Sequence, residues 1–327
     1  NKSGMILTCK ELGKRYRETA HFDKAIDYHR KGLMYAMQLQ DTVEIIQALN
    51  NLGTNFRRLG IMDEASSYHY QALMLCERSS NKTTFIAKKN RVMSLSGIGN
   101  VYLTLDNLDA ADSIFRVTLA GEQELHSDLG QAMNYANLGS VFETRGMIDS
   151  ALVYYQLSME HNRKAHSDLG ISLCHNHFGR LFALEGKWND ALREYRNAYD
   201  LMEKTGDDWH WLEACLSLVR VNISKGNIRV AKVYLDKAQR TADAIHAWEH
   251  LSEVYRLRYL CYEKAGDCRQ ALDSYIRSRA YADSVKNVDN VNHIQNLRVN
   301  YERERSLREM TLLRGTYETV SYTHLRA

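Results

Sequence analysis

Two histidine pairs are the side chains whose type and spacing come closest to a metal-binding arrangement. His246 and His250 are four residues apart, a spacing that brings two imidazoles to one face of a helix, where both could bind a zinc ion. The repeat phase described below, however, assigns His246 to a turn and His250 to the next helix. His175 and His177 are two apart and lie on different helix faces, so we expect one to be packed and the other to face a groove. Because the sequence fixes no cysteine or carboxylate beside either pair, it predicts no metal site.

Motifs for catalysis are absent from the sequence. It has no glycine-rich phosphate loop, no nucleophile elbow and no paired-carboxylate motif. We therefore predict that the protein is not an enzyme and has no catalytic residue and no cofactor. Trp209 and Trp211 begin a helix and are expected to pack rather than to stack on a ligand. The six cysteines include no Cys-x-x-Cys pair and are expected to be small buried residues, although Cys261 and Cys268 could face each other across one helical hairpin.

Composition excludes further classes. The chain has 43 basic and 40 acidic residues and a net charge of +3, without the basic excess of a nucleic-acid-binding protein. No apolar run approaches the roughly 20 residues that a membrane-spanning helix needs. Proline is absent, which suits nearly continuous helix and argues against proline-rich turns and disordered linkers.

A five-residue pattern recurs seven times along the chain. Its copies are LGKRY, LGTNF, IGNVY, LGSVF, FGRLF, LVRVN and RYLCY, with second residues at positions 13, 53, 99, 139, 179, 219 and 259. The steps are 40, 46, 40, 40, 40 and 40 residues, and HSDLG also recurs at 126–130 and 166–170. This regularity indicates internal duplication and an array of seven units, which we number 1 to 7.

Unit 4 illustrates the positions that follow the pattern. We expect Gly146 to end a first helix in the left-handed conformation and the side chain of Asp149 to cap a second helix. Ala151 should lie where two helices come too close for a larger side chain, and Tyr155 should fill the space between helices. The alanine recurs in all seven units, and the other three positions recur in most of them.

The units resemble the tetratricopeptide repeat (TPR) family, whose signature is L-G-x-x-Y, then A-x-x-x-F, then a proline. The likeness covers roughly residues 5–285. It departs in its period of 40 rather than 34, in the missing proline, and in unit 6, where Val219 and Asn222 replace the motif residues. The resemblance implies an all-α fold: a right-handed, TPR-like superhelical solenoid of about seven 40-residue helix-turn-helix repeats at residues 3–285. The six extra residues before unit 3, around 79–84, predict a longer loop or a helix extension.

Residues 286–318 keep one apolar face after the repeats stop, through Val288, Val291 and Ile294. They predict a C-terminal helix that caps the last repeat and serves as a linker. Residues 319–327 break from this pattern and are expected to be a non-native tail. The combination of a repeat array and a following helix resembles the TPR regions of bacterial sensor histidine kinases and helix-turn-helix regulators. The residues that carry this resemblance are 282–285 and 301–302.

In the TPR family the first helix of each pair lines a concave groove that holds a partner. Carried over position by position, the resemblance implies a partner-binding groove formed by polar residues around the motif glycine. These candidates are Lys14, Arg17, Asn51, Arg57, Asn100, Asn137, His177, Arg180 and Arg220. Asparagine can both donate to and accept from a peptide backbone, and arginine can bind a carboxylate with two hydrogen bonds. Arg180 and Arg220 occupy the same repeat position with no carboxylate at the matching positions, so we expect an acidic partner near them.

The predicted function is a non-catalytic module that binds a protein or peptide segment, as the sensor or interaction region of a bacterial signalling protein such as a two-component system. Two alternatives stay open: a free-standing scaffold or adaptor, and the regulatory array of an enzyme whose catalytic domain is missing. What the gene encodes after Glu318 would distinguish them. The compartment also stays open, because six cysteines favour a reducing one and the resemblance favours the extracytoplasmic part of a membrane-anchored sensor.

Overall fold

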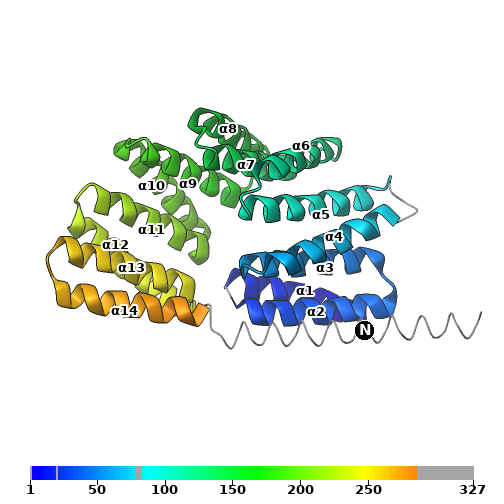
Figure 1. The fold of residues 1–327 in the computed structure, drawn as a ribbon, viewed down its shortest axis with the longest axis horizontal. Helices are drawn as coiled ribbons and strands as arrows, with labels where there is room; N and C mark the ends of the chain where they lie inside the picture. Colours follow the sequence, from blue (N-terminus) through cyan, green and yellow to red (C-terminus); the bar gives the residue numbers. More distant parts are fainter. Residues whose placement is uncertain (1, 20, 79–82, 286–327) are drawn as a thin grey trace, which may run out of the picture. The chain divides into compact units, whose positions relative to one another are not determined.

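The structure, a computed structural model, describes residues 2–19, 21–78 and 83–285. Within this part of the chain it consists of fourteen helices and no strand, drawn in chain order in Figure 1. They are α1 (Lys2–Glu18), α2 (Phe22–Leu39), α3 (Thr42–Arg58), α4 (Met62–Arg78), α5 (Phe85–Thr104), α6 (Leu108–Glu124), α7 (Asp128–Thr144), α8 (Ile148–Lys164), α9 (Asp168–Leu184), α10 (Trp188–Thr205), α11 (Asp208–Ser224), α12 (Ile228–Ala244), α13 (Trp248–Lys264) and α14 (Cys268–Val285). The predicted all-α fold is confirmed, and none of these helices is long and apolar enough to span a membrane.

Each unit is a helical hairpin, with an odd-numbered first helix and an even-numbered second helix. Five of the turns within hairpins contain a glycine in the left-handed conformation, for example Gly146 with φ 73° and Gly266 with φ 75°. Asp106 takes this conformation in unit 3, with φ 59°. Because left-handed backbone costs glycine no steric strain, this position ends the first helix, as predicted.

The predicted cap of the second helices is wrong. Helix α8 begins at Ile148, so Asp149 lies inside its first turn, and the capping residue is Met147, which provides no side-chain hydrogen bond. At that position Asp149 instead interacts favourably with the partial positive charge of the helix N-terminus. Several first helices have side-chain caps: the Asp41 carboxylate accepts from the Glu44 amide, and Ser127 and Ser167 cap α7 and α9 in the same way. Among the second helices, α6 is capped by the side chain of Asn107.

The motif glycine and the ring sixteen residues later form the centre of each hairpin. A Cβ on Gly139 would lie 2.6 Å from the Tyr155 ring, and a Cβ on Gly179 would lie 2.6 Å from the Tyr195 ring. The glycine therefore lets the ring lie directly against the backbone of the first helix. Unit 6 replaces the glycine with Val219 and compensates with a smaller partner, Leu235.

Unit 7 departs from this packing. Tyr259 stands where the glycine would be, and the ring of Tyr275 meets it edge-on, with centroids 5.9 Å apart. Tyr275 is 51% exposed, so the prediction that this position fills the inter-helix space is wrong for unit 7. The cause is steric, since a side chain on Tyr259 occupies the space that the glycine leaves free elsewhere.

The alanine that recurs in every unit lies at a close helix crossing, as predicted. Ala151 is completely buried, as are its equivalents in the other units except Ala271, which is 6% exposed. Successive first helices such as α3 and α5, or α11 and α13, also contact one another, and successive second helices in the described part of the chain have no comparable approach. This arrangement is the one expected when first helices lie on the inner side of a curved stack.

Three expectations fall wholly or partly outside the described residues. They are the loop at 79–82, the capping and linker helix at 286–318, and the tail at 319–327. Part of the six-residue insertion does extend a helix, because α5 has 20 residues where α7 has 17.

Candidate functional site

The predicted groove residues lie on first helices, where several connect one unit to the next. The Arg17 guanidinium on α1 donates to the side-chain oxygen of Asn51 on α3, at 3.0 Å. The Arg57 guanidinium on α3 reaches the hydroxyl of Thr104 on α5, at 3.5 Å. Both arginines are partly buried and lie near the like charge of Arg58, and these two influences lower the pKa of each guanidinium. These side chains form a polar ladder along the first helices.

Arg180 lies in the most connected part of this ladder. Its guanidinium on α9 donates to both oxygens of the Glu143 carboxylate on α7, at 2.5 and 2.7 Å. Glu143 also accepts from the Tyr155 hydroxyl at 2.6 Å, and the imidazole of His177 lies 2.9 Å from Arg180. Burial alone would raise the pKa of Glu143, but the hydrogen bonds and charge of Arg180 hold it below its usual range.

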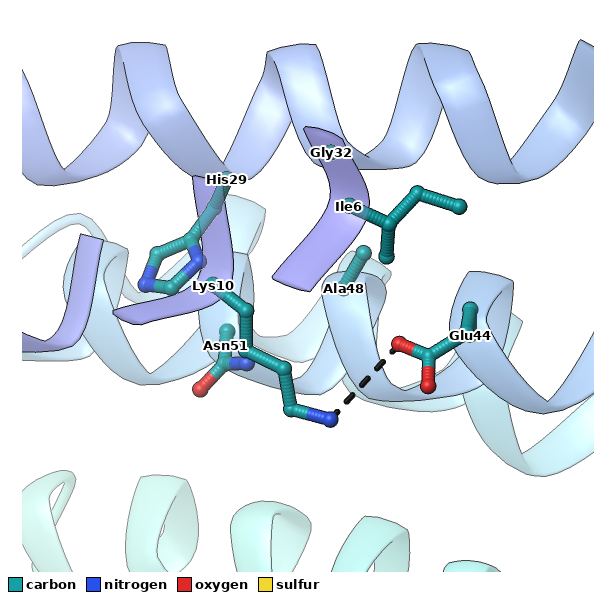
Figure 2. A pocket seen from close by; sticks show the side chains of 7 residues that line it. All are labelled: Ile6, Lys10, His29, Gly32, Glu44, Ala48 and Asn51. Carbon is teal, nitrogen blue, oxygen red and sulfur yellow. Dashed lines mark ion pairs between the residues drawn. The ribbon is translucent and has the colours of Figure 1, made fainter. Parts of the chain in front are cut away.

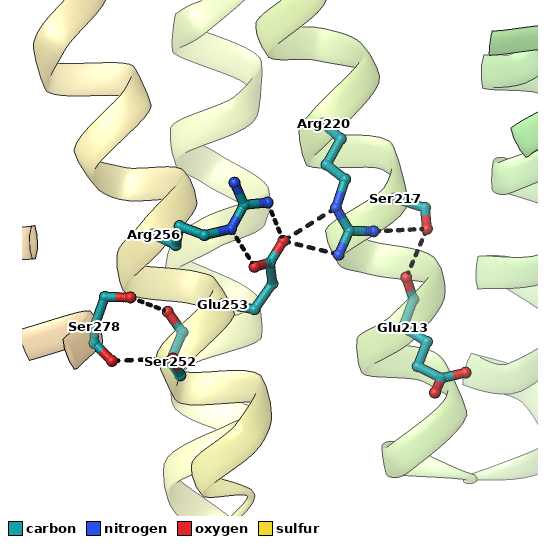
Figure 3. Close-up of polar contacts among 7 residues, drawn as sticks. All are labelled: Glu213, Ser217, Arg220, Ser252, Glu253, Arg256 and Ser278. Carbon is teal, nitrogen blue, oxygen red and sulfur yellow. Dashed lines mark hydrogen bonds and ion pairs between the residues drawn. The ribbon is translucent and has the colours of Figure 1, made fainter. Parts of the chain in front are cut away.

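Arg220 has a similar arrangement one unit further on, shown in Figure 3. Its guanidinium on α11 donates to one oxygen of Glu253 on α13, at 2.8 and 3.1 Å, and a second guanidinium, from Arg256, binds the same carboxylate. Arg220 also donates to the hydroxyl of Ser217, at 3.4 Å. Burial raises the pKa of Glu253, but the two arginines outweigh it and lower the pKa.

These ion pairs correct the expectation that Arg180 and Arg220 lack carboxylate partners. The carboxylate partners do not occupy the same repeat position as the arginines. Glu143 lies four residues beyond the motif glycine of the preceding unit, and Glu253 lies six before the equivalent residue of the following unit. The expectation of an acidic partner depended on two unpaired guanidinium groups. Because both groups are paired within the chain, this expectation is not supported.

The remaining candidates are less constrained. The Lys14 ammonium lies 3.9 Å from the Glu18 carboxylate, with both side chains more than half exposed. Asn100 donates to the backbone carbonyl of Ser96 on its own helix, at 2.8 Å. Asn137 is half-buried on α7. No network joins these three, so the structure does not bring all nine candidates together in one site.

Asn51 also lines a small cavity between units 1 and 2, shown in Figure 2. In that view the Lys10 ammonium reaches toward the Glu44 carboxylate, 3.6 Å away, and the imidazole of His29 lies beside Lys10 and Asn51. The cavity has a volume of about 10 Å³, enough for about one water molecule. It is too small to be a ligand site.

Exposed apolar side chains on the first helices were missed in the sequence. Met93 and Met133 occupy the same repeat position and are 42% and 62% exposed, and Leu129 and Leu169 share another position at 49% and 39%. Met133 precedes Ser140 by seven residues, so the two lie on one face of α7. The sequence does indicate such a surface, because these residues occupy repeat positions that are apolar but do not belong to the packing motif.

A larger groove lies between α8, α9 and α10. Its volume is about 520 Å³. It is lined by Leu152, Gln156, Met159, Glu160, Arg163, His175, Phe178, Phe182 and Glu194. The His175 imidazole lines this groove and lies 2.8 Å from the Glu194 carboxylate. Sequence reasoning did not find this groove.

The histidines and cysteines show no metal or disulfide arrangement in the described part of the chain. No cluster of three or more metal-ligating side chains occurs there. His246 lies in the turn before α13 with φ 53°, and His250 is buried in that helix against the edge of Trp209. Cys261 is buried and Cys268 exposed, and both are free thiols. Trp211 is buried against Tyr199, as expected of a packing residue.

Comparison with solved structures identifies the fold. No protein-family model matches the chain, and neither does any curated protein. The chain is similar to the Rap conjugation gene regulator of the plasmid pLS20 in complex with the Phr* peptide, with a TM-score of 0.64, 15% identity, and coverage of 86% of this chain and 75% of that one. It is also similar to aspartyl phosphate phosphatase F from Bacillus subtilis, with a TM-score of 0.59, 11% identity and coverage of 86% and 71%.

A third similar structure contains a repeat array of the predicted type. It is the STAND signal transduction ATPase with a tetratricopeptide repeat sensor from Pyrococcus horikoshii, with a TM-score of 0.56, 12% identity, and coverage of 86% of this chain and 44% of that one. At these identities the likeness establishes the fold. Together with the seven in-phase motif copies, it shows that the described residues up to 285 form a solenoid of the tetratricopeptide repeat type.

Proposed function

We propose that this array is a non-catalytic module that binds a peptide or protein segment along its first helices. The observation that carries the proposal is the row of exposed Met93, Met133, Leu129 and Leu169 beside the polar ladder. Solvent-exposed methionine and leucine at repeated positions give an adaptable apolar surface, and flanking polar side chains can orient a bound backbone. The peptide complex of the similar Rap regulator supports this use of the fold.

The repeat positions define where a bound segment would lie. Met133, Asn137 and Ser140 follow one another on one face of α7, at intervals of four and three residues. A segment lying across this face would place apolar side chains on Met133 and its backbone near Asn137. The ion pair between Glu143 and Arg180 then acts mainly to hold α7 and α9 in register, because both charges already have partners.

The test begins with selection of peptides from a random displayed library against the full chain. Affinities of selected peptides are then compared for Met133→Asp and for Val153→Asp, which changes a similarly exposed residue on the second helix of the same unit (62% and 53% exposed). We expect Met133→Asp to weaken binding by at least about tenfold, because a charge is placed on desolvated surface, and Val153→Asp to leave it unchanged. Equal effects of the two variants, or the absence of any selected peptide, would contradict the proposal.

We further propose that the array serves as the sensor or interaction region of a bacterial signalling protein. The similar TPR sensor of the STAND protein and the similar Rap regulator support this context. The test is the sequence of the complete gene: a membrane span with a kinase domain, or a DNA-binding domain, is expected after these repeats. A stop codon directly after Glu318 would favour a free-standing adaptor, and an enzyme domain would favour a regulatory array.

A further inference from the structure

The larger groove lies where unit 5 lacks a ring that units 1, 2 and 4 have. In units 1, 2 and 4 a tyrosine of the second helix stacks on a ring of the first helix in the same hairpin. The stacked pairs are Tyr28 on Tyr16, Tyr68 on Phe56 and Tyr154 on Phe142, with ring centroids 5.4, 5.4 and 5.0 Å apart. In unit 5 the first-helix ring is retained as Phe182, but the tyrosine position holds Glu194. Phe182 lines the groove that this replacement opens.

Unit 4 shows how the missing ring would sit. Tyr154 lies nearly parallel to Phe142, with 14° between the ring planes, and its hydroxyl accepts from Arg116 of the preceding unit at 3.3 Å. The residue equivalent to Arg116 one unit later is Gln156 on α8 of unit 4, which lines the groove and offers an amide donor at the corresponding place for a ring in unit 5. The groove thus retains both the stacking surface and the hydrogen-bond donor of a tyrosine site.

Glu194 itself does not fill the space. Its side chain is 13% exposed, and its carboxylate is directed to the imidazole of His175 at 2.8 Å and to Arg193 at 3.3 Å. The volume of about 520 Å³ lies in the range of roughly 300–1,000 Å³ found for small-ligand pockets. The carboxylates of Glu160 and Glu194, against the single guanidinium of Arg163, favour a neutral occupant, and a phenol hydroxyl suits this lining because it can accept a hydrogen bond from Gln156 and also donate one.

We propose that this groove binds a tyrosine side chain of a partner protein segment, which stacks on Phe182 and accepts a hydrogen bond from Gln156. It is a second site, on a part of the fold formed largely by second helices, and it does not depend on the surface around Met133. The partner supplies in trans the ring that Tyr154 supplies within unit 4.

The experiment follows the methyl resonance of Met159, a buried lining residue, in the full chain labelled at methionine methyl groups. The probe is an acetylated and amidated Gly-Tyr-Gly peptide, with Gly-Phe-Gly for comparison. We expect the tyrosine peptide to shift this resonance, and the phenylalanine peptide to bind roughly threefold to tenfold more weakly because one hydrogen bond is lost. The variant Gln156→Leu, at an exposed position, should remove that preference.

The variant Glu194→Tyr restores the residue of the neighbouring units. It should raise the melting temperature and abolish the Met159 response, because its own ring fills the groove. Asn197→Tyr places the same ring on an exposed position of α10 and should leave the titration unchanged. A missing response to the tyrosine peptide, a response that survives Glu194→Tyr, or a tyrosine preference that survives Gln156→Leu would each overturn the proposal. Tighter binding of 4-methylphenol than of the peptide would overturn the assignment to a partner segment.

Discussion

The imidazole of His177 lies flat on the phenol ring of Tyr155, with centroids 4.3 Å apart and planes only 5° from parallel. The two residues belong to consecutive units, so their contact joins the second helix of unit 4 to the first helix of unit 5. Burial and the charge of Arg180 lower the pKa of His177 to about 3, which keeps the stacked imidazole neutral at ordinary pH. Glu143 and Arg180 complete this junction between units.

Replacement of Arg180 by Ala should raise the pKa of Glu143. Burial is the largest influence on this carboxylate and favours its neutral form, and the hydrogen bonds and charge of Arg180, with smaller contributions from Tyr155 and His177, now outweigh it. Because the Arg180 side chain is 47% exposed, we expect a loss of only about 1 kcal/mol in the free energy of unfolding. A carboxyl titration followed by NMR measures the first effect. Arg193→Ala, on an exposed side chain, is the control, and an unchanged Glu143 titration in Arg180→Ala would contradict this account.

Replacement of Asn55 by Val should stabilise the protein. Asn55 is completely buried, and neither polar atom of its amide has a hydrogen-bond partner in the described part of the chain. Its equivalents in the following three units are Val101, Val141 and Leu181, all buried and apolar. Removing an unsatisfied buried amide should add about 1–3 kcal/mol to the free energy of unfolding, measured by urea denaturation. Thr54→Val, at a half-buried neighbour, should have a smaller effect.

Replacement of Ala151 by Leu should destabilise the array. Ala151 is completely buried at a helix crossing, and three added carbon atoms would displace α7 or α8. Overpacking of this kind costs about 1–3 kcal/mol, which thermal and urea unfolding can resolve. The same substitution at Ala183, which is half-buried, provides the comparison. Equal melting temperatures for the wild type and Ala151→Leu would show that the crossing is looser than described.

Stability should fall as the pH falls below about 6.5, the usual histidine value. Burial lowers the pKa of His29 to about 3 and that of His69 to about 4, so between pH 6.5 and these values the unfolded chain binds protons that the folded chain does not. Each histidine then removes about 1.4 kcal/mol of stability per pH unit, and this loss is absent above the unfolded pKa. His29→Phe, which copies Phe115 of unit 3, should reduce the slope measured by urea denaturation between pH 6 and 4. A slope equal to that of the wild type would contradict the assignment.

The repeat made the local packing predictable from the sequence. Ala151 and Tyr155 each have a steric role that depends on one neighbouring helix at a fixed separation, and Gly146 has a backbone role within the turn itself, so their positions in the motif were sufficient. The predicted position of the capping residue of α8 was wrong by two residues, because the sequence does not show where the turn after Gly146 ends. Met147 caps without a side-chain hydrogen bond, and a pattern search therefore favours Asp149.

The candidate site was harder to predict, because its contacts join different repeat positions. Arg180 pairs with a residue 37 positions earlier, and Arg220 pairs with one 33 positions later. These separations depend on side-chain length and on the rotation between units, which a comparison of equivalent positions does not include. Glu194 was different, because its departure from a column that holds tyrosine in four of the seven units is visible in the sequence itself.

The pairing of each motif residue with a side chain sixteen positions later also bears on how the chain folds. Contacts within a hairpin close a loop of only sixteen residues, and contacts between units rarely join residues more than about fifty apart. Loop closure of this kind costs little conformational entropy, so folding can begin in any hairpin and spread to its neighbours. Opening can likewise be confined to part of the array, and hydrogen exchange should then show blocks of amides, each one or more hairpins long, with distinct opening free energies.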